Sequence, residues 1–169
     1  RLRDMPFEDL GFAKVDHHRA LRTGFPEVIF CPGKTPEQVS RIAAAMREQD
    51  QVVLATHASA EIYQAVQAVA SEAVYHKQAR IVQIGQPETP PSQRGSVLVM
   101  SAGTSDIPVA EEARVTVAAA GCKVQSLYDV GVAGLHRLLG HREMLEQAAA
   151  IVVVAGMEGA LSSVVGGLV

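Results

Sequence analysis

Three polar segments that contain glycine are the parts of this chain best suited to bind and act on a ligand. They are SAGTSD at 101–106, DVGVAGLHR at 129–137 and AGMEGALSS at 155–163. Each one follows a run of residues that is typical of a strand. Glycine lets a backbone approach a ligand closely, and hydroxyl, carboxylate, imidazole and guanidinium groups bind anions or transfer protons. The chemistry of the chain is therefore expected in these segments.

The segment at 101–106 has the composition of an anion-binding turn. It lies between a predicted strand and a predicted helix, so its amides and hydroxyl groups face the positive end of that helix. This arrangement suits a phosphate group. An alternative stays open on the segment alone, in which Ser105 or Asp106 only caps the helix ahead of Ile107 and Pro108.

The other two segments carry ionisable side chains next to glycines. In the second, His136 and Arg137 place a titratable ring and a fixed charge near the start of a helix. A solvated helix would explain that pair equally well. In the third, Glu158 lies between Gly156 and Gly159, and the alternative is a glutamate that caps the next helix. None of the three segments decides the function by itself.

An alternation of strands and helices positions these segments and predicts an α/β fold. The predicted strands lie at 28–31, 52–56, 80–85, 96–100, 122–128 and 151–155. The predicted helices lie at 36–49, 59–71, 108–120 and 135–149. The first helix has a characteristic start, with Thr35 as its N-cap and Pro36 at its first position.

Continuous apolar strands joined by helices indicate a parallel sheet with helices on both faces. In such sheets ligands bind beyond the carboxyl ends of the strands. We therefore expect four side chains at one edge of one sheet, namely those of Ser105, Asp106, Arg137 and Glu158.

Composition divides the chain into four parts. Residues 1–25 are predicted to be a polar arm, which holds a charged cluster of His17, His18, Arg19 and Arg22. Residues 26–85 are predicted to form a small βαβαβ module. Residues 86–95 contain three of the eight prolines and are a predicted linker, and residues 96–169 form the second α/β domain.

Charge and composition exclude several classes of function. The 15 Lys and Arg against 18 Asp and Glu give a net charge of −3, and no basic run could follow a nucleic-acid backbone. Cys31 and Cys122 form neither a disulfide framework nor a metal-ligand spacing. No membrane span or signal-peptide core is present, so we expect a cytoplasmic protein without a membrane partner.

Both ends are expected to be cut from a longer protein, because the chain lacks an initiator Met and stops in an apolar run.

The second half of the sequence is similar to the aminoimidazole ribonucleotide carboxylase family. The similarity lies in three pairs at the ends of successive strands, namely Ser105-Asp106, His136-Arg137 and Ala155-Gly156. Across nearly the whole chain, the sequence more closely resembles the pyridinium-3,5-biscarboxylic acid mononucleotide synthases of nickel-pincer nucleotide assembly. Their hallmark segments resemble those at 11–31, 101–113, 129–139 and 153–161.

The resemblance implies a flavodoxin-like, PurE-like parallel sheet, incomplete at its C-terminus, preceded by a small α/β module. It also implies a carboxylase and hydrolase. Such enzymes add carbon dioxide, supplied as CO₂ or bicarbonate, to C5 of the pyridinium ring of nicotinic acid adenine dinucleotide, and cleave its phosphoanhydride to release AMP. A cysteine thiolate adds to ring C4, so that C5 becomes nucleophilic enough to attack carbon dioxide.

The same resemblance implies roles for individual residues. Asp106 and Glu158 are the predicted catalytic residues, which orient ribose or transfer protons. Arg137 would bind a phosphate or the ring carboxylate. The predicted substrate-binding residues are Ser101, Gly103, Thr104, Ser105, His136, Arg137, Gly156 and Gly159.

Two departures from these families matter. The nucleophilic cysteine of the synthases lies beyond the AGMEGAL turn, and neither Cys31 nor Cys122 matches it, so residues 1–169 alone are expected to be inactive. The histidine that purine carboxylases carry after their glycine-rich turn has no counterpart in GALSSVV, which counts against the purine reaction.

Two other functions stay open at this point. One is an aminoimidazole ribonucleotide carboxylase or mutase, and the other is a non-catalytic nucleotide-binding module. We expect a homo-oligomer, because the families assemble symmetrically and the end GALSSVVGGLV resembles a helix buried between subunits. Mg²⁺ is a candidate to assist the hydrolysis where carboxylates and phosphates meet, although no residue is predicted as its ligand.

Overall fold

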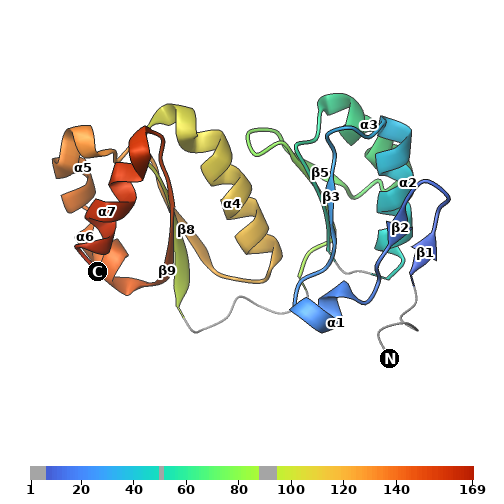
Figure 1. The fold of residues 1–169 in the computed structure, drawn as a ribbon, viewed down its shortest axis with the longest axis horizontal. Coiled ribbons are helices and arrows are strands. Elements are labelled where there is room, and N and C mark those ends of the chain that lie inside the picture. Colours follow the sequence, from blue (N-terminus) through green and yellow to red (C-terminus); the bar gives the residue numbers. More distant parts are fainter. Residues whose placement is uncertain (1–6, 50–51, 88–94) are drawn as a thin grey trace. The chain divides into compact units, whose positions relative to one another are not determined.

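The computed structural model describes residues 7–49, 52–87 and 95–169 (Figure 1). The chain divides into two compact units, Arg1–Glu88 and Thr89–Val169. Most of the predicted linker at 86–95 lies outside the described residues, so its character as a linker stays a prediction. The two units are described separately below.

The first unit has a sheet with the strand order β3-β4-β6-β5 among its described residues. These strands are β3 (Val28–Phe30), β4 (Val53–Thr56), β5 (Val74–His76) and β6 (Ile81–Ile84). The helices α2 (Pro36–Arg47) and α3 (Ala60–Val69) connect β3 to β4 and β4 to β5. Ahead of them lie β1 (Glu8–Asp9) and β2 (Lys14–Val15), which pair antiparallel, and the short helix α1 (Arg19–Thr23).

Helix α2 begins as the sequence predicts. The Thr35 side chain accepts a hydrogen bond from the Gln38 amide at 3.2 Å, and the Gln38 side chain accepts one from the Thr35 amide at 3.0 Å. This reciprocal pair satisfies two donors that the first turn of a helix would otherwise leave unpaired. Val39 and Met46 on the inner face of the helix are fully buried, so the capped helix covers the core of the unit.

The third strand of this module differs from the prediction. The predicted strand at 80–85 is present as β6, but the strand that continues the parallel βαβαβ crossover is β5, which the sequence did not reveal. The chain then reverses and inserts β6 between β4 and β5, antiparallel to both. The reason is that β5 lies at the edge of the sheet and is only partly buried, so it lacks the continuous apolar run that marks a central strand.

The second unit confirms the predicted parallel sheet of a flavodoxin-like α/β fold. Its described strands are β7 (Ser96–Ser101), β8 (Val124–Leu127) and β9 (Ala148–Val154), in the order β8-β7-β9, with both pairings parallel. Its helices are α4 (Ile107–Ala119), α5 (Leu135–Leu139), α6 (Arg142–Gln147) and α7 (Ala160–Gly166). Figure 1 shows α4 on one face of the sheet and the other three helices on the opposite face.

The core of this unit is formed where β7 lies between its two partners. Leu98, Val99 and Met100 of β7 are fully buried, which fits a central strand covered on both faces. On one side, Leu98 and Met100 belong to an apolar cluster that also includes Leu138 and Leu145 of the helices. The sheet is thereby held rigidly at the end where the polar segments follow.

The helix predicted at 135–149 is broken into α5 and α6. Both Gly140 and His141 lie between these two helices, and the amide of His141 donates to the Leu138 carbonyl instead of continuing the α-helical ladder. The next strand also begins at Ala148, three residues before the predicted start at 151. Alanine favours helices, but pairing with β7 outweighs that preference here.

Within residues 7–49, 52–87 and 95–169, no helix has the length and apolar character required to cross a membrane.

Candidate functional site

A cavity of about 320 Å³ lies at the carboxyl ends of β7, β8 and β9. All three polar segments contribute to its wall, as the parallel order of the strands requires. The lining residues are Ala102, Gly103, Asp106, Asp129, Gly131, Val132, Ala133, Arg137, Ala155, Gly156, Met157, Ala160 and Leu161. This volume lies near the lower end of the range of roughly 300–1,000 Å³ that is typical of small-molecule sites.

Four of the predicted site residues line this cavity: Gly103, Asp106, Arg137 and Gly156. The other six are not among the residues of its wall: Ser101, Thr104, Ser105, His136, Glu158 and Gly159. Of these, Thr104, Ser105, His136 and Glu158 have exposed side chains. The proposed roles of all ten residues stay predictions, but the cavity brings a carboxylate and a guanidinium together with three polar turns.

Ser101 supports the site from inside the protein. It is completely buried, and its Oγ accepts a hydrogen bond from the Asp129 amide at 3.2 Å. The Ser101 carbonyl accepts a second bond, from the amide of Val130, at 3.1 Å. These two contacts extend the pairing of β7 and β8 beyond the strands and fix the start of the second polar segment.

Asp129 is a cavity residue that the sequence analysis missed. Its carboxylate forms an ion pair with Arg137, at 2.7 Å between Oδ2 and Nη1. Its backbone is left-handed, with φ 59°, which is uncommon for any residue but glycine. A sequence signal did exist, because aspartate adopts this conformation more readily than most residues and Asp129 directly follows a predicted strand.

Two glycines of the second segment are needed for close approaches. A Cβ atom on Gly131 would lie 2.7 Å from the carbonyl oxygen of Ala102, which belongs to the first segment. A Cβ atom on Gly134 would lie 2.8 Å from Nε of Arg137, so the guanidinium folds back over this glycine. The first glycine lets two segments meet, and the second makes room for the charged side chain.

Asp106 has a local structural contact as well as a place in the cavity wall. Its Oδ2 accepts a hydrogen bond from the Gly103 amide at 2.9 Å, within the 3₁₀ turn η2 (Thr104–Asp106). This bond closes the turn ahead of α4 and orients the carboxylate. Asp106 occupies the N-cap position of α4, but its side chain makes no capping hydrogen bond to that helix, so the capping alternative holds for its position alone.

Glu158 lies in a turn of unusual backbone geometry. Met157, Glu158 and Gly159 have φ angles of 26°, 53° and 67°, so the turn η4 (Met157–Gly159) has two non-glycine residues at positive φ. Left-handed geometry costs a non-glycine residue roughly 1–2 kcal/mol. The exposed Glu158 side chain does not reach the cavity wall, and a role in catalysis would require the turn or the ligand to bring the two together.

Neither described cysteine lies in the wall of this cavity. Cys31 is buried in the first unit, and this burial raises the pKa of its thiol to about 11, against the opposing effect of the Lys34 charge. A thiol with so high a pKa is almost entirely protonated near neutral pH and is a poor nucleophile. Cys122 is half-buried ahead of β8, at the opposite end of that strand from the cavity.

The described part of the chain holds no group of three or more His, Cys, Asp or Glu side chains that could bind a metal ion. Asp106 and Asp129 are the carboxylates in the cavity wall. Substrate phosphates and water would have to complete the coordination of any Mg²⁺ that binds there.

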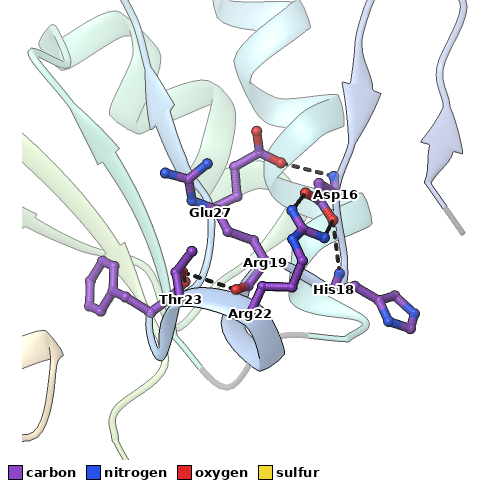
Figure 2. A network of polar contacts seen from close by, with 7 residues as sticks. Asp16, His18, Arg19, Arg22, Thr23 and Glu27 are labelled. Carbon is purple, nitrogen blue, oxygen red and sulfur yellow. Dashed lines mark hydrogen bonds and ion pairs between the residues drawn. The ribbon is translucent and has the colours of Figure 1, made fainter. Parts of the chain in front are cut away.

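Polar contacts hold the segment around α1, from Asp16 to Glu27 (Figure 2). The Asp16 carboxylate accepts hydrogen bonds from the Arg22 guanidinium and, at 3.1 Å, from the His18 amide, while the Asp16 amide donates to Glu27 at 2.9 Å. The hydrogen bond from Arg22 holds the pKa of Asp16 below its usual value. Helix α1 buries none of its residues, so these polar contacts take the place of apolar packing. Arg19 of the polar arm is exposed.

Comparison with known families bears on this first unit. Residues 7–86 match the family described as the LarB/PurE-like N-terminal domain. The resemblance found in the sequence is thereby confirmed at the level of the family. The match covers the hairpin β1-β2, helix α1 and the whole mixed sheet of the first unit.

A relative of the whole chain extends the comparison into the second unit. An uncharacterized protein of Methanocaldococcus jannaschii is 36% identical over 164 residues, an alignment that includes 92% of this chain. That share is larger than the LarB/PurE-like N-terminal domain, so the similarity extends into the second unit. The chain spans 64% of the length of this relative.

The contact between the first two segments can be tested with a pair of glycine substitutions. We expect Gly131→Ala to lower the free energy of unfolding by about 1–3 kcal/mol, the usual cost of overpacking, because its Cβ meets backbone that cannot rotate away. Gly134→Ala is the matched control, since its Cβ meets only side-chain atoms, those of Arg137 and His136, and no backbone. Urea denaturation measures both. A Gly131→Ala protein as stable as the control would show that the segments do not meet as described.

The burial of Cys31 predicts its chemical reactivity. In the folded protein near neutral pH, we expect a thiol reagent to modify Cys122 well before Cys31, because the Cys31 pKa of about 11 leaves almost no thiolate. Modification of Cys31 should accelerate as the pH rises toward that pKa. Peptide mapping by mass spectrometry distinguishes the two sites, and unfolding in urea should equalise them. Equal rates in the folded protein would contradict the burial of Cys31.

Proposed function

We propose that this chain is part of a carboxylase that acts on the pyridinium ring of nicotinic acid adenine dinucleotide. The proposed enzyme adds carbon dioxide at ring C5 and hydrolyses the phosphoanhydride, which releases AMP. The observation that carries the proposal is the joining of a LarB/PurE-like N-terminal domain to a parallel sheet with a cavity made of three of the four hallmark segments. The family match supports a carboxylase-type function, and the specific substrate rests on the resemblance of those segments.

The cavity wall suits the ring end of this substrate. Most of its side chains are small and apolar, which fits a flat heterocycle, and Arg137 offers a guanidinium that can bind a carboxylate with two parallel hydrogen bonds. The Asp106 carboxylate lies in the same wall and is oriented by the Gly103 amide. In the proposed reaction, Asp106 orients the ribose or accepts the proton that leaves C5 after carboxylation.

The proposed chemistry needs a nucleophile at ring C4. Its thiolate adds to C4 and forms a dihydropyridine, C5 then attacks carbon dioxide, and loss of the C5 proton with expulsion of the thiolate restores the aromatic ring. Cys31 is unsuited to this step because it is buried and protonated. We propose that the cysteine comes from the rest of the reading frame.

The proposal is tested with the protein expressed from its complete reading frame. We expect it to convert nicotinic acid adenine dinucleotide and labelled bicarbonate into an acid-stable labelled mononucleotide, with release of AMP. Liquid chromatography with mass spectrometry identifies both products. The same protein offered aminoimidazole ribonucleotide should leave it unchanged. Conversion of the imidazole with no change in the pyridinium would establish a purine carboxylase instead, and binding without turnover of either would favour a non-catalytic module.

A further inference from the structure

The charged groups of the cavity do not match a simple anion. The ionisable side chains among its lining residues are Asp106, Asp129 and Arg137, two carboxylates and one guanidinium. Their formal charges leave the cavity wall with one net negative charge. A dianionic phosphate alone would be repelled by such a wall, whereas an apolar ring with a positive charge would be attracted. The wall therefore favours a ligand that carries both signs of charge.

Asp129 is held where it can contact such a ring. The buried Ser101 hydroxyl accepts its amide hydrogen at 3.2 Å, and the backbone is kept at φ 59°. Left-handed residues other than glycine are strained, and they occur preferentially at sites where the geometry serves a function. The protein retains this conformation in the wall of a cavity, with half of the carboxylate side chain exposed.

The ion pair with Arg137 leaves capacity for a ligand on both partners. A guanidinium has five N–H donors, and Asp129 takes the contact at Nη1, at 2.7 Å. A ligand carboxylate can therefore bind other donors of Arg137 while the pair stays intact. The side chains of Arg137 and Asp129 are 38% and 50% exposed, so a ligand can approach either one.

We propose that Asp129 is a specificity-determining residue that recognises the positive charge of a pyridinium ring whose carboxylate binds Arg137. The ion pair thus presents one charge of each sign to a zwitterionic ring. The inference rests on the proposed function, because it assigns the ring of that substrate to this pair. This recognition role differs from a positioning role. If Asp129 only positioned Arg137, the affinity would not depend on the charge of the ring.

Two ligands that differ only in ring charge separate these roles. Nicotinic acid mononucleotide has a cationic ring, and the 3-carboxyphenyl riboside 5′-phosphate has a neutral ring of the same shape with the same carboxylate. We expect the complete wild-type protein to bind the cationic ligand about tenfold more tightly in calorimetry, which corresponds to about 1.4 kcal/mol. Asp129→Asn should abolish this preference and leave affinity for the neutral ligand within about twofold.

The variant should fold, since asparagine also tolerates left-handed backbone, and thermal melting checks this directly. Asp9→Asn is the matched control, because it makes the same change at an exposed residue of β1 and should keep the preference. Equal weakening of both ligands by Asp129→Asn, or an absence of preference in the wild type, would overturn the inference and leave the proposed function standing. Failure of the wild type to bind either ligand would also overturn the inference, whereas the proposed function is overturned only if the complete protein does not convert the dinucleotide.

Discussion

The site depends on the central place of β7 between two parallel partners. Pairing with β8 on one side and β9 on the other brings the carboxyl ends of all three strands to one edge of the sheet. The pairing continues past the strands, because Ser101 and Ala102 accept hydrogen bonds from residues 129–131 and the Ala102 amide donates to Val154. The wall of the cavity is therefore an extension of the sheet.

This constraint explains which residues of the site tolerate change and which do not. Gly131 must lack a side chain because two extended segments touch there, whereas Gly134 lacks one only to admit a guanidinium. Ser101 acts at a distance from any ligand, by fixing Asp129 from the buried side. Asp129 in turn neutralises and orients Arg137. The charge that a ligand meets is thus set by a short chain of contacts that starts inside the core.

Much of this could be predicted from the sequence, because the signals are local. Helix α2 follows from Thr35 and Pro36, and β7 follows from an apolar run that stays buried on both faces. The meeting of the three segments follows from parallel topology alone. Other features depend on contacts distant in sequence: the insertion of β6 beside β4, the extension of β9 through three alanines, and the Asp129–Arg137 pair. Glycine-rich spacing predicted a turn around Glu158 correctly, but the direction of its side chain could not be derived from spacing.

The central claim to test is that the ring of the substrate binds in this cavity. The most direct measurement is a crystal structure of the complete protein with nicotinic acid mononucleotide. We predict the pyridinium ring inside the cavity between residues 102–106, 129–137 and 155–161, with its carboxylate on Arg137 and its ring nitrogen on the side of Asp129. A ring bound elsewhere, with this cavity unoccupied and the Asp129–Arg137 pair unchanged, would contradict the account.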